Sequence, residues 1–464
     1  SMNNIYSNTS TGYAMYAHNG TSNFDSDYNN YYTAGNCLIN REGACYPNLS
    51  IYQSTYSVND YYDESSLSLN PAFVSSSNLT PQSFLMDDMG TSGLGVSEDI
   101  NGTNRSASTP DMGAVEYTAS EVALSGNYSI GSGGDFSTIS EAVSALNMQG
   151  VSAAVTFNIN PGEYQEQVEI LPISGSSISN TVTFQSSTGV ATDVLLRFEA
   201  MISSNNYIVL LNGADYITIK DMTFQPEGNS YARSIVFAGG ADHVTIQNNR
   251  FNGYPIDSSS DNYTSIYAIS SYGIDRIIQD NTFIGGGGWA INLTSGGYNQ
   301  GDGQSTGLEI TGNSITDTYN GIHLSYYDEA IVSGNTISGD GMISYGINLE
   351  YCNGQIEISN NYIDADNLDY GIRLYGNTGS TYNRGLIANN MISVEKYGIR
   401  IDYYNHYQNI YHNTAVTSHT SGYSFYYDDY YGSNIKSMNN IYSNTSTGYA
   451  MYAQSGASNF DSDY

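Results

Sequence analysis

The sequence predicts an all-β protein, a parallel β-helix solenoid with one short α-helix, from three observations. A motif of the form Asn-x-apolar recurs through the second half of the chain at steps of 22 to 32 residues. A second motif, of the Gly-Ile-x-Leu type, lies between its copies. Both motifs alternate apolar and polar residues as β-strands do, and Gly and Asn separate them at predicted corners. Two or three short strands in a period of about 27 residues describe one coil of a parallel β-helix.

The first motif places an asparagine at the same point of every predicted coil. Asparagine tolerates left-handed backbone angles, and its amide can bond to the asparagine one coil above or below. Such stacking gives a ladder with a structural role. The predicted ladder consists of Asn249, Asn281, Asn313, Asn335, Asn361, Asn390, Asn413 and Asn440.

The second motif predicts a column of side chains on the outer wall of the solenoid. Its clearest copies are Tyr345–Leu349, Tyr370–Leu374 and Tyr397–Ile401, and looser copies follow at Gly422 and Gly448. The residue between Ile and Leu points away from the core. The predicted column runs through Asn292, His323, Asn348, Arg373, Arg400, Ser424 and Ala450.

A single helix is predicted over residues 135–147. Ile139, Ala142, Val143 and Leu146 fall on one face, and Thr138 and Glu141 have the spacing of a capping box. A helix just before the first coil is well placed to cover unpaired strand edges.

Residues 1–28 recur almost unchanged at 437–464, with differences only at His18/Gln454, Asn19/Ser455 and Thr21/Ala457. A copy displaced by 436 residues is what a window cut from a tandem array would show. We therefore expect a fragment of a longer chain built from repeats of about 436 residues.

The charge balance excludes two classes of partner. The 464 residues include 12 Lys and Arg against 45 Asp and Glu, a net charge of −33. Nucleic acid and anionic membrane surfaces would be repelled. No apolar run approaches the length of a membrane span, so we expect no membrane insertion.

The cysteines and acidic pairs leave alternatives open. Cys37 and Cys45 could form a disulfide in an extracellular protein or remain two unpaired thiols, and Cys352 is most simply a small buried residue. No cofactor is predicted, although Asp461 and Asp463 are weak candidates for calcium ligands.

Two segments resemble parts of the pectin-lyase-like right-handed β-helix superfamily. Residues 131–170 resemble its entry, with Asp135-Phe136, the helix, and Gly162-x-Tyr164-x-Glu166-x-Val168-x-Ile170. Residues 99–117 resemble the closing segment of secreted bacterial β-helix proteins, at Asp99, Ile100, Gly102, Arg105, Asp111, Gly113, Ala114 and Glu116. The resemblance implies that residues 1–117 end one repeat and residues 118–464 begin the next, with coils from about 150 to 464.

The resemblance also implies a possible chemistry. Relatives that cleave pectate bind calcium through clustered aspartates and use an Arg or Lys as base. Arg373 and Arg400 are the weak catalytic candidates, and the alternative is that they relieve repulsion on an acidic wall. We expect that the chain is not an enzyme. One catalytic copy would suffice for most enzymes, whereas this chain is expected to come from an array of nearly identical tandem copies.

Tyrosines cluster in polar surroundings and suggest an adhesive surface, because tyrosine offers rigid amphipathic contact area. The alternative is outer-wall stacking that stiffens the solenoid. The candidates are Tyr326, Tyr327, Tyr403, Tyr404, Tyr426, Tyr427, Tyr430 and Tyr431.

The preferred function is a structural and adhesive repeat of a giant extracellular filament or surface adhesin. Tandem copies lengthen a filament and multiply weak contacts. The chain resembles giant adhesins of gliding bacteria exported by the type IX route, and the grappling-hook filaments of predatory bacteria. Expected partners are adjacent repeats, further chains in an oligomer or bundle, and a cell-surface or glycan ligand. The alternatives are a polysaccharide lyase or hydrolase and a phage-type receptor-binding fibre.

Overall fold

The computed structural model divides into two compact units, each described here by itself. One holds residues 1–126, 141–155 and 172–180, and the other holds 127–140, 156–171 and 181–464. The structure describes residues 1–10, 12–17, 26–33, 37–46, 49, 52–53, 63–71, 73–83, 86–118, 122–268, 270–296, 305–428, 431–453 and 460–463.

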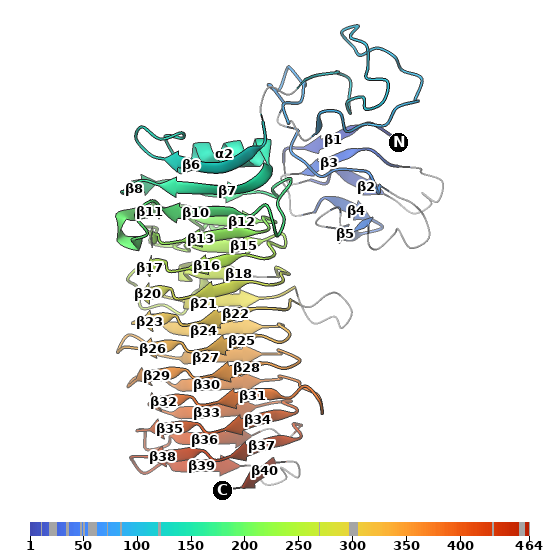
Figure 1. Ribbon diagram of the computed structural model, residues 1–464. Helices are drawn as coiled ribbons and strands as arrows, with labels where there is room; N and C mark the ends of the chain where they lie inside the picture. Colours follow the sequence, from blue (N-terminus) through green and yellow to red (C-terminus); the bar gives the residue numbers. More distant parts are fainter. Residues whose placement is uncertain are drawn as a thin grey trace. The chain divides into compact units, whose positions relative to one another are not determined.

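The predicted parallel β-helix is confirmed: three long sheets stack strand upon strand along the solenoid (Figure 1). The first sheet comprises β6 (Leu124–Ile130), β7 (Val151–Ile159), β10 (Val182–Ser186), β13 (Ile217–Lys220), β16 (Thr245–Gln247), β19 (Ile277–Gln279), β22 (Glu309–Thr311), β25 (Ile331–Ser333), β28 (Glu357–Ser359), β31 (Gly385–Ala388), β34 (Gln408–Tyr411), β37 (Ile435–Met438) and β40 (Phe460–Asp463).

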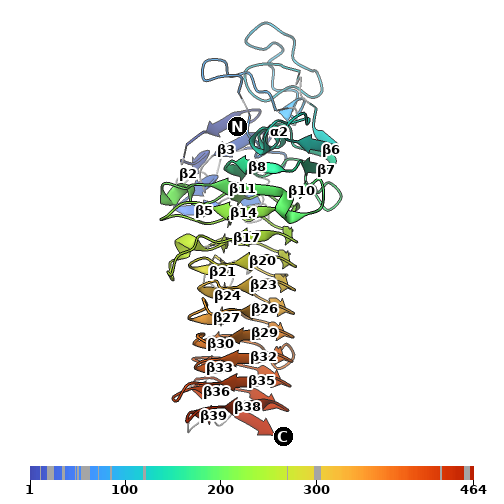
Figure 2. The same ribbon diagram turned by 90° about the vertical axis from the view of Figure 1, so that its left-hand side faces the viewer.

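The second sheet, seen face-on in Figure 2, comprises β8 (Gly162–Gln165), β11 (Val194–Phe198), β14 (Thr223–Pro226), β17 (Arg250–Asn252), β20 (Thr282–Ile284), β23 (Ser314–Thr316), β26 (Thr336–Ser338), β29 (Tyr362–Ala365), β32 (Met391–Val394), β35 (Thr414–Thr417) and β38 (Ile441–Asn444). The third sheet comprises β9 (Val168–Ile170), β12 (Val209–Asn212), β15 (Ile235–Ala238), β18 (Ile266–Ala268), β21 (Trp289–Thr294), β24 (Asn320–Ser325), β27 (Tyr345–Glu350), β30 (Tyr370–Tyr375), β33 (Tyr397–Asp402), β36 (Tyr423–Asp428) and β39 (Tyr449–Ala453).

The core of the solenoid is a set of columns in which like residues stack. Phe224, Phe251 and Phe283 occupy one register position of the second sheet and are fully buried. Their ring centroids lie 5.2 and 4.7 Å apart. Successive side chains on a strand point to opposite faces of the sheet, so the residues next to each phenylalanine on its own strand face outward. This explains the alternating sequence pattern.

The recurring asparagines form a continuous chain of hydrogen bonds at the corner between the first and second sheets. In each step the backbone N–H and the side-chain amide of one asparagine donate to the side-chain oxygen of the next. For Asn335 and Asn361 the two distances are both 3.0 Å. The chain runs without interruption from Asn249 to Asn440, and Asn377 and Asn405 form a second, shorter chain.

The predicted helix is present as α2 (Ile139–Gln149), four residues shorter at its start than the sequence pattern indicated. Ala142, Val143 and Leu146 are buried. Its first turn is held by Glu166, whose carboxylate accepts from the backbone N–H of Ile139 and Ser140 at 3.2 and 2.7 Å. A carboxylate at this end also suits the helix dipole. Three short 3-10 helices, Ala191–Asp193, Ser203–Asn205 and Asp261–Tyr263, lie in loops.

The N-terminal part of the chain carries β1 (Ile5–Asn8), β2 (Met15–Ala17), β3 (Asn30–Thr33), β4 (Ile39–Arg41) and β5 (Ala44–Tyr46). The strand β1 pairs in parallel with β3, and β2 pairs in parallel with β4. Cys37 and Cys45 are joined by a disulfide, and Cys352 is a buried free thiol. None of the helices in the described part of the chain is long and apolar enough to cross a membrane.

Candidate functional site

The outer face of the third sheet carries aligned columns of polar and aromatic side chains near its C-terminal end. The strands β27, β30, β33 and β36 begin with Tyr345, Tyr370, Tyr397 and Tyr423, whose rings stack at centroid distances of 4.8 to 5.7 Å. The next outward position holds Asn348, Arg373, Arg400 and Tyr426. The strand ends hold Glu350, Tyr375, Asp402 and Asp428.

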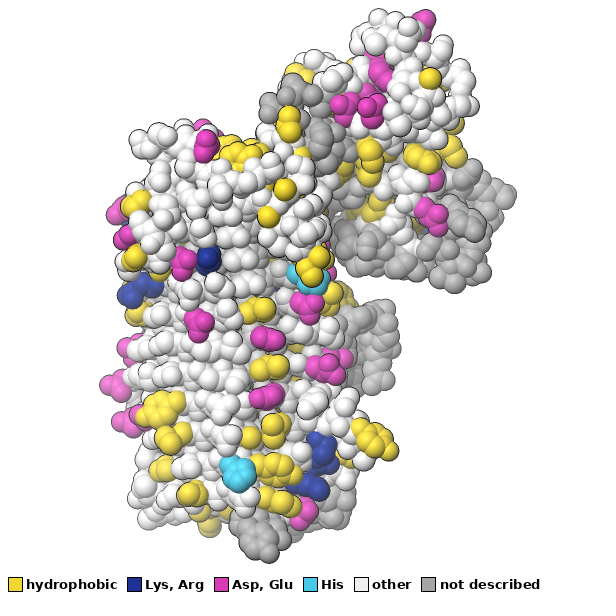
Figure 3. Space-filling model, viewed as in Figure 1, with side chains coloured by type: hydrophobic (Ala, Val, Ile, Leu, Met, Phe, Trp, Pro, Cys, Tyr) yellow, Lys and Arg dark blue, Asp and Glu magenta, His cyan; other side chains and the backbone are white. Residues whose placement is uncertain are grey.

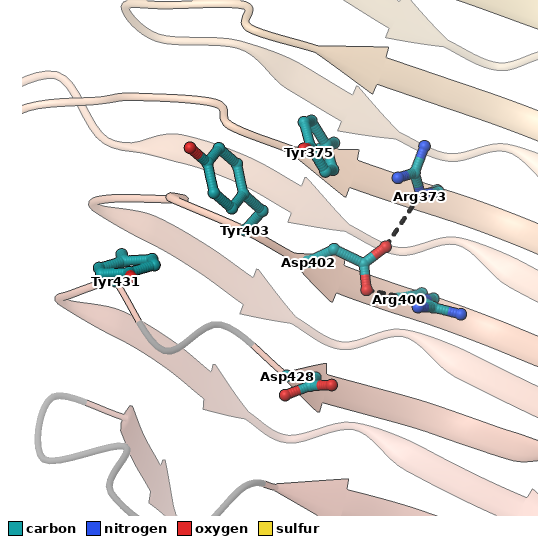
Figure 4. A pocket seen from close by; sticks show the side chains of 7 residues that line it. All are labelled: Arg373, Tyr375, Arg400, Asp402, Tyr403, Asp428 and Tyr431. Atoms are coloured by element: carbon teal, nitrogen blue, oxygen red, sulfur yellow. Dashed lines mark hydrogen bonds and ion pairs between the residues drawn. The ribbon is translucent and has the colours of Figure 1, made fainter.

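Two arginines meet one carboxylate in the middle of this face (Figure 4). Arg373 Nε donates to Asp402 at 2.9 Å, and Arg400 Nε donates to its other oxygen at 2.5 Å. Arg373 Nη1 also donates to Glu350 at 2.9 Å. Within the described part of the chain, Nη2 of both arginines has no hydrogen-bond acceptor. Those two N–H groups remain available to a ligand.

A hollow of about 260 Å³ lies beside this ion-paired group. Figure 4 shows Tyr375, Tyr403 and Tyr431 along one side of it and Asp428 one strand beyond Asp402. The rings of Tyr375 and Tyr403 stack at 5.0 Å. Asp428 accepts a hydrogen bond from the Tyr426 hydroxyl at 2.9 Å. The hollow therefore combines aromatic faces, guanidinium donors and two carboxylates on adjacent strands. Basic side chains occur in only a few places on the face of the molecule that Figure 3 shows.

The electrostatics of the arginines limit what they can do. Burial alone would lower the pKa of Arg373, but Asp402 and Glu350 outweigh it and raise that pKa above its ordinary value. Burial alone would also lower the pKa of Arg400, but Asp402 outweighs this effect and raises that pKa above its ordinary value. Both guanidinium groups therefore stay protonated, and neither can serve as the proton-abstracting base that the superfamily resemblance implied.

The structure brings Arg373 and Arg400 together but corrects the predicted column beyond them. Ser424 and Ala450 do not continue the column, because Tyr397 pairs with Tyr423 and Arg400 therefore faces Tyr426. Tyr452 follows in the next strand. Ser424 is instead buried.

The tyrosine candidates separate by burial. Tyr403, Tyr404 and Tyr431 are 44, 49 and 58% exposed, Tyr426 is half-buried, and Tyr326 stacks on Tyr351 at 5.3 Å. Tyr327 and Tyr427 are buried and cannot contribute to a surface. Tyr327 accepts from Arg276 at 3.3 Å in the interior. Tyr430 lies outside the described residues.

The described residues contain no group of three or more His, Cys, Asp or Glu side chains placed to hold a metal ion. Asp461 is exposed, and the side chain of Asp463 lies outside the described part. Sequence reasoning missed Asp428 and Tyr375. An alignment of the Gly-Ile-x-Leu motif extended by one residue beyond Leu would have placed Tyr375 in the same column as Glu350 and Asp402.

Comparison with known proteins gives one family model and several similar solved structures. A family described as periplasmic copper-binding protein (NosD) matches residues 300–460. XylC in complex with xylose aligns over 72% of this chain and 76% of its own, at 13% identity and a TM-score of 0.48. The Azotobacter vinelandii mannuronan C-5 epimerase AlgE4 A-module aligns over 67% and 91%, at 12% identity and 0.39. The parallel β-helix fold itself is shown by the three stacked parallel sheets of this chain. No curated protein matches the sequence significantly.

The prediction that the chain is not an enzyme is overturned by these comparisons. Carbohydrate-active enzymes predominate among the similar structures, and they include the Eubacterium ramulus GH136 lacto-N-biosidase, at 8% identity over 73% of this chain and 67% of its own with a TM-score of 0.43. Such identities establish the fold alone.

The copper binding named for the NosD family does not fit the residues seen here. In the matched range, Cys352 is fully buried and its thiol contacts the carbonyl oxygens of Leu324 and Glu350. His323 Nδ1 accepts from Asn348 at 3.0 Å, and His406 contacts Ser433 at 2.7 Å. No two of these groups converge with a third ligand in the described part of the chain.

Proposed function

We propose that this chain acts on a polysaccharide at the outer wall of the third sheet, as a glycoside hydrolase in which Asp402 and Asp428 are the reacting carboxylates. The observation that carries the proposal is their placement on paired positions of β33 and β36, beside the hollow lined by Tyr375, Tyr403 and Tyr431. A sugar chain laid along the wall would meet ring faces and carboxylates together.

The tyrosines supply the binding contacts in this proposal. Tyrosine rings stack on the apolar faces of sugar rings, and their two side-chain torsions cost little entropy on binding. The available Nη2 groups of Arg373 and Arg400 are donors for sugar hydroxyls or carboxylates. Because two guanidinium groups face the three carboxylates of Glu350, Asp402 and Asp428, the wall does not require a charged glycan.

The two aspartates have different surroundings, as acid and base must. Asp402 accepts hydrogen bonds from both arginines through its two oxygens, and in this proposal it is the base or nucleophile. Asp428 has the Tyr426 hydroxyl as its hydrogen-bond donor and is only half-buried, and in this proposal it is the general acid. Paired positions on adjacent strands lie about 4.8 Å apart at the backbone, a spacing compatible with two carboxylates flanking one glycosidic bond.

The test is the release of reducing ends from a panel of neutral and acidic glycans. Asp402→Asn and Asp428→Asn should each lower the rate at least 100-fold on the responsive glycan. Asp364→Asn is the matched control, because Asp364 accepts from Tyr362 at 3.0 Å two residues away, as Asp428 does from Tyr426, but on the second sheet. Unchanged rates in both site variants, or no activity on any glycan, would refute the proposal.

A second function, attachment to cells or surfaces, is favoured by the exposed tyrosines and by the repeat at 1–28 and 437–464. In this second function the chain lies outside the cell as a repeat of a filament or surface adhesin that is exported by the type IX route. Its partners are adjacent repeats and a glycan. A phage-type receptor-binding fibre is the remaining alternative. Glycan pull-down combined with the reducing-end assay separates the two functions. Adhesion predicts that the unaltered chain retains a glycan without releasing reducing ends from it, and that Tyr403→Ala and Tyr431→Ala weaken this retention.

A further inference from the structure

The two copies of the repeated segment fold into the same coil. Met2 bridges Asp27 in parallel, and their counterparts Met438 and Asp463 pair in the same way. Asn4 donates to Ser1 Oγ at 2.9 Å, as Asn440 does to Ser437 Oγ at 3.1 Å. Ser10 and its counterpart Ser446 both donate through the backbone N–H to an asparagine two residues earlier, at 3.0 and 2.8 Å. Equal sequence here gives equal local structure.

The N-terminal copy carries a further layer made by residues 29–117. The strands β3 and β4 add to β1 and β2 in parallel register, with Tyr6 opposite Tyr31 and Met15 opposite Ile39. The rings of Tyr6 and Tyr31 stack at 5.3 Å. Asn4 donates its N–H and its amide to Asn29 Oδ1 at 3.0 and 2.9 Å, which is one more rung of an asparagine ladder.

Later parts of the same segment hold this coil as well. The side chain of Asn3 donates to the Thr91 carbonyl and accepts from the Thr91 N–H, both at 2.8 Å. Gly113 donates its N–H to the Asn3 carbonyl at 2.8 Å and lies against Ile5. We call the surface of residues 1–8 that makes these contacts the N-seat, and the corresponding residues 437–444 the C-seat.

The C-seat has the same groups without the added layer. The strands β38, β39 and β40 are the last in their sheets as far as the structure describes the chain (Figures 1 and 2). Asn440 accepts from Asn413, but within the described residues its own N–H has no acceptor. Ile441, the counterpart of Ile5, is 63% exposed, and Asn439, the counterpart of Asn3, is exposed.

We propose that the C-seat binds residues 29–117 of a second copy of this chain, in the register seen at the N-seat. Asn440 then donates to Asn29 of the second copy, and Asn439 exchanges hydrogen bonds with the backbone of its Thr91. Tyr442 lies opposite Tyr31 of the second copy, and Met451 lies opposite its Ile39. The ladder from Asn249 to Asn440 gains its next rung. The contact joins the end of one molecule to the beginning of another, so it is heterologous and builds open chains.

Competition between the two seats governs assembly. In each molecule, residues 29–117 already occupy the N-seat. The N-seat lies in the same chain, so its effective concentration is high and binding to it is favoured over binding to the C-seat of another molecule. Substitutions that weaken the N-seat release residues 29–117, which can then bind the C-seat of another molecule. Because the seats are near-identical in sequence, equivalent substitutions can be made in either.

The first experiment measures sedimentation velocity from 1 to 200 μM for three variants of the full chain. The N-seat variant carries Asn4→Ala and Ile5→Asp, the C-seat variant carries Asn440→Ala and Ile441→Asp, and the third carries all four. We expect concentration-dependent oligomers in the N-seat variant and monomers in the other two. Oligomers in the fourfold variant, or a monomeric N-seat variant, would overturn the docking.

The second experiment does not depend on the folding of the N-seat variant. Ser7 lies opposite Tyr32, so Ser443 should lie opposite the second copy's Tyr32. A chain with Tyr32→Cys and Ser443→Cys should form disulfide-linked oligomers under mild oxidation, at least tenfold more than a chain with Tyr32→Cys and the out-of-register Ser446→Cys. Tyr32→Cys with Ser7→Cys is the intramolecular control. Equal linking in the first two chains, with the control intact, would overturn the proposed register.

Discussion

The asparagine ladder makes a large and specific contribution to stability, and Asn335→Ala tests it. Asn335 is fully buried. Its Oδ1 accepts from the N–H and the amide of Asn313 at 3.0 and 2.9 Å, and its own amide donates to the Ile310 carbonyl at 2.9 Å. Alanine leaves both Asn313 donors buried without an acceptor.

The expected loss follows from those stranded groups. A buried donor without a partner costs about 1–3 kcal/mol. Two such donors predict a loss of about 4 kcal/mol, read from the midpoint and slope of guanidinium unfolding followed by circular dichroism. Asn440→Ala should cost only about 1–2 kcal/mol, because Asn440 is only half-buried and water can replace its side-chain oxygen as the acceptor for Asn413.

The matched control is Asn367→Ala, because Asn367 is an exposed turn residue with one side-chain bond, to the Asp340 carbonyl at 3.0 Å. We expect it to lower the free energy of unfolding by less than about 0.5 kcal/mol. If Asn335→Ala lowers the free energy of unfolding no more than Asn367→Ala does, the asparagine ladder does not contribute to stability and the prediction is wrong.

Three further perturbations have defined outcomes. Phe251→Ala opens a cavity between two stacked rings and should lower the free energy of unfolding by about 3–5 kcal/mol in the same assay, whereas Phe251→Leu should cost less than half of that. Reduction of the Cys37–Cys45 disulfide releases a short loop and should destabilise the N-terminal unit by about 2.5 kcal/mol, measured by hydrogen exchange in β4 and β5 with and without reductant. Burial raises the pKa of Asp215 to about 6, so its ionisation opposes folding: the contribution of Asp215 to stability is greatest below about pH 4 and is lost as the pH rises through about 6. Asp215→Asn should therefore gain about 1–3 kcal/mol on the wild type between pH 4 and pH 7, and an unchanged difference in unfolding midpoint across that range would contradict the assignment.

The fold could be predicted because its strongest signals are local and repeated. Each Asn-x-apolar motif reports one corner and each Tyr-Gly-Ile motif one strand, so errors in one coil do not propagate to the next. The steps between corners vary from 22 to 32 residues, yet the register of the sheets is kept. The variation is taken up in the loops, where sequence gives no periodic signal.

The candidate site could be predicted only in part, for the same reason. Arg373 and Arg400 were found because they occupy the variable position of a clear motif. Tyr426 was predicted as a surface tyrosine but not as the next member of the arginine column, because the motif degenerates in β36, where Ser424 takes the place of the motif glycine. An alignment anchored on Gly422 is shifted by two residues, so it assigns the column position to the buried Ser424 in place of Tyr426, while the alternation of apolar and polar residues stays nearly the same. Hydrophobic pattern alone cannot detect such an error.

The stacked geometry links the proposed activity to the proposed assembly. A column such as Asn348, Arg373, Arg400 and Tyr426 exists only while each strand keeps its register with the next, and the asparagine ladder fixes that register at the corner of every coil. Asp402 lies two coils and Asp428 one coil before the last asparagine of the ladder. A second copy docked at Asn440 would therefore tighten the coils that carry the two carboxylates. If both proposals hold, the heat resistance of the N-seat variant should rise with its concentration, and adding Asn440→Ala and Ile441→Asp should abolish that rise while leaving the glycan specificity unchanged.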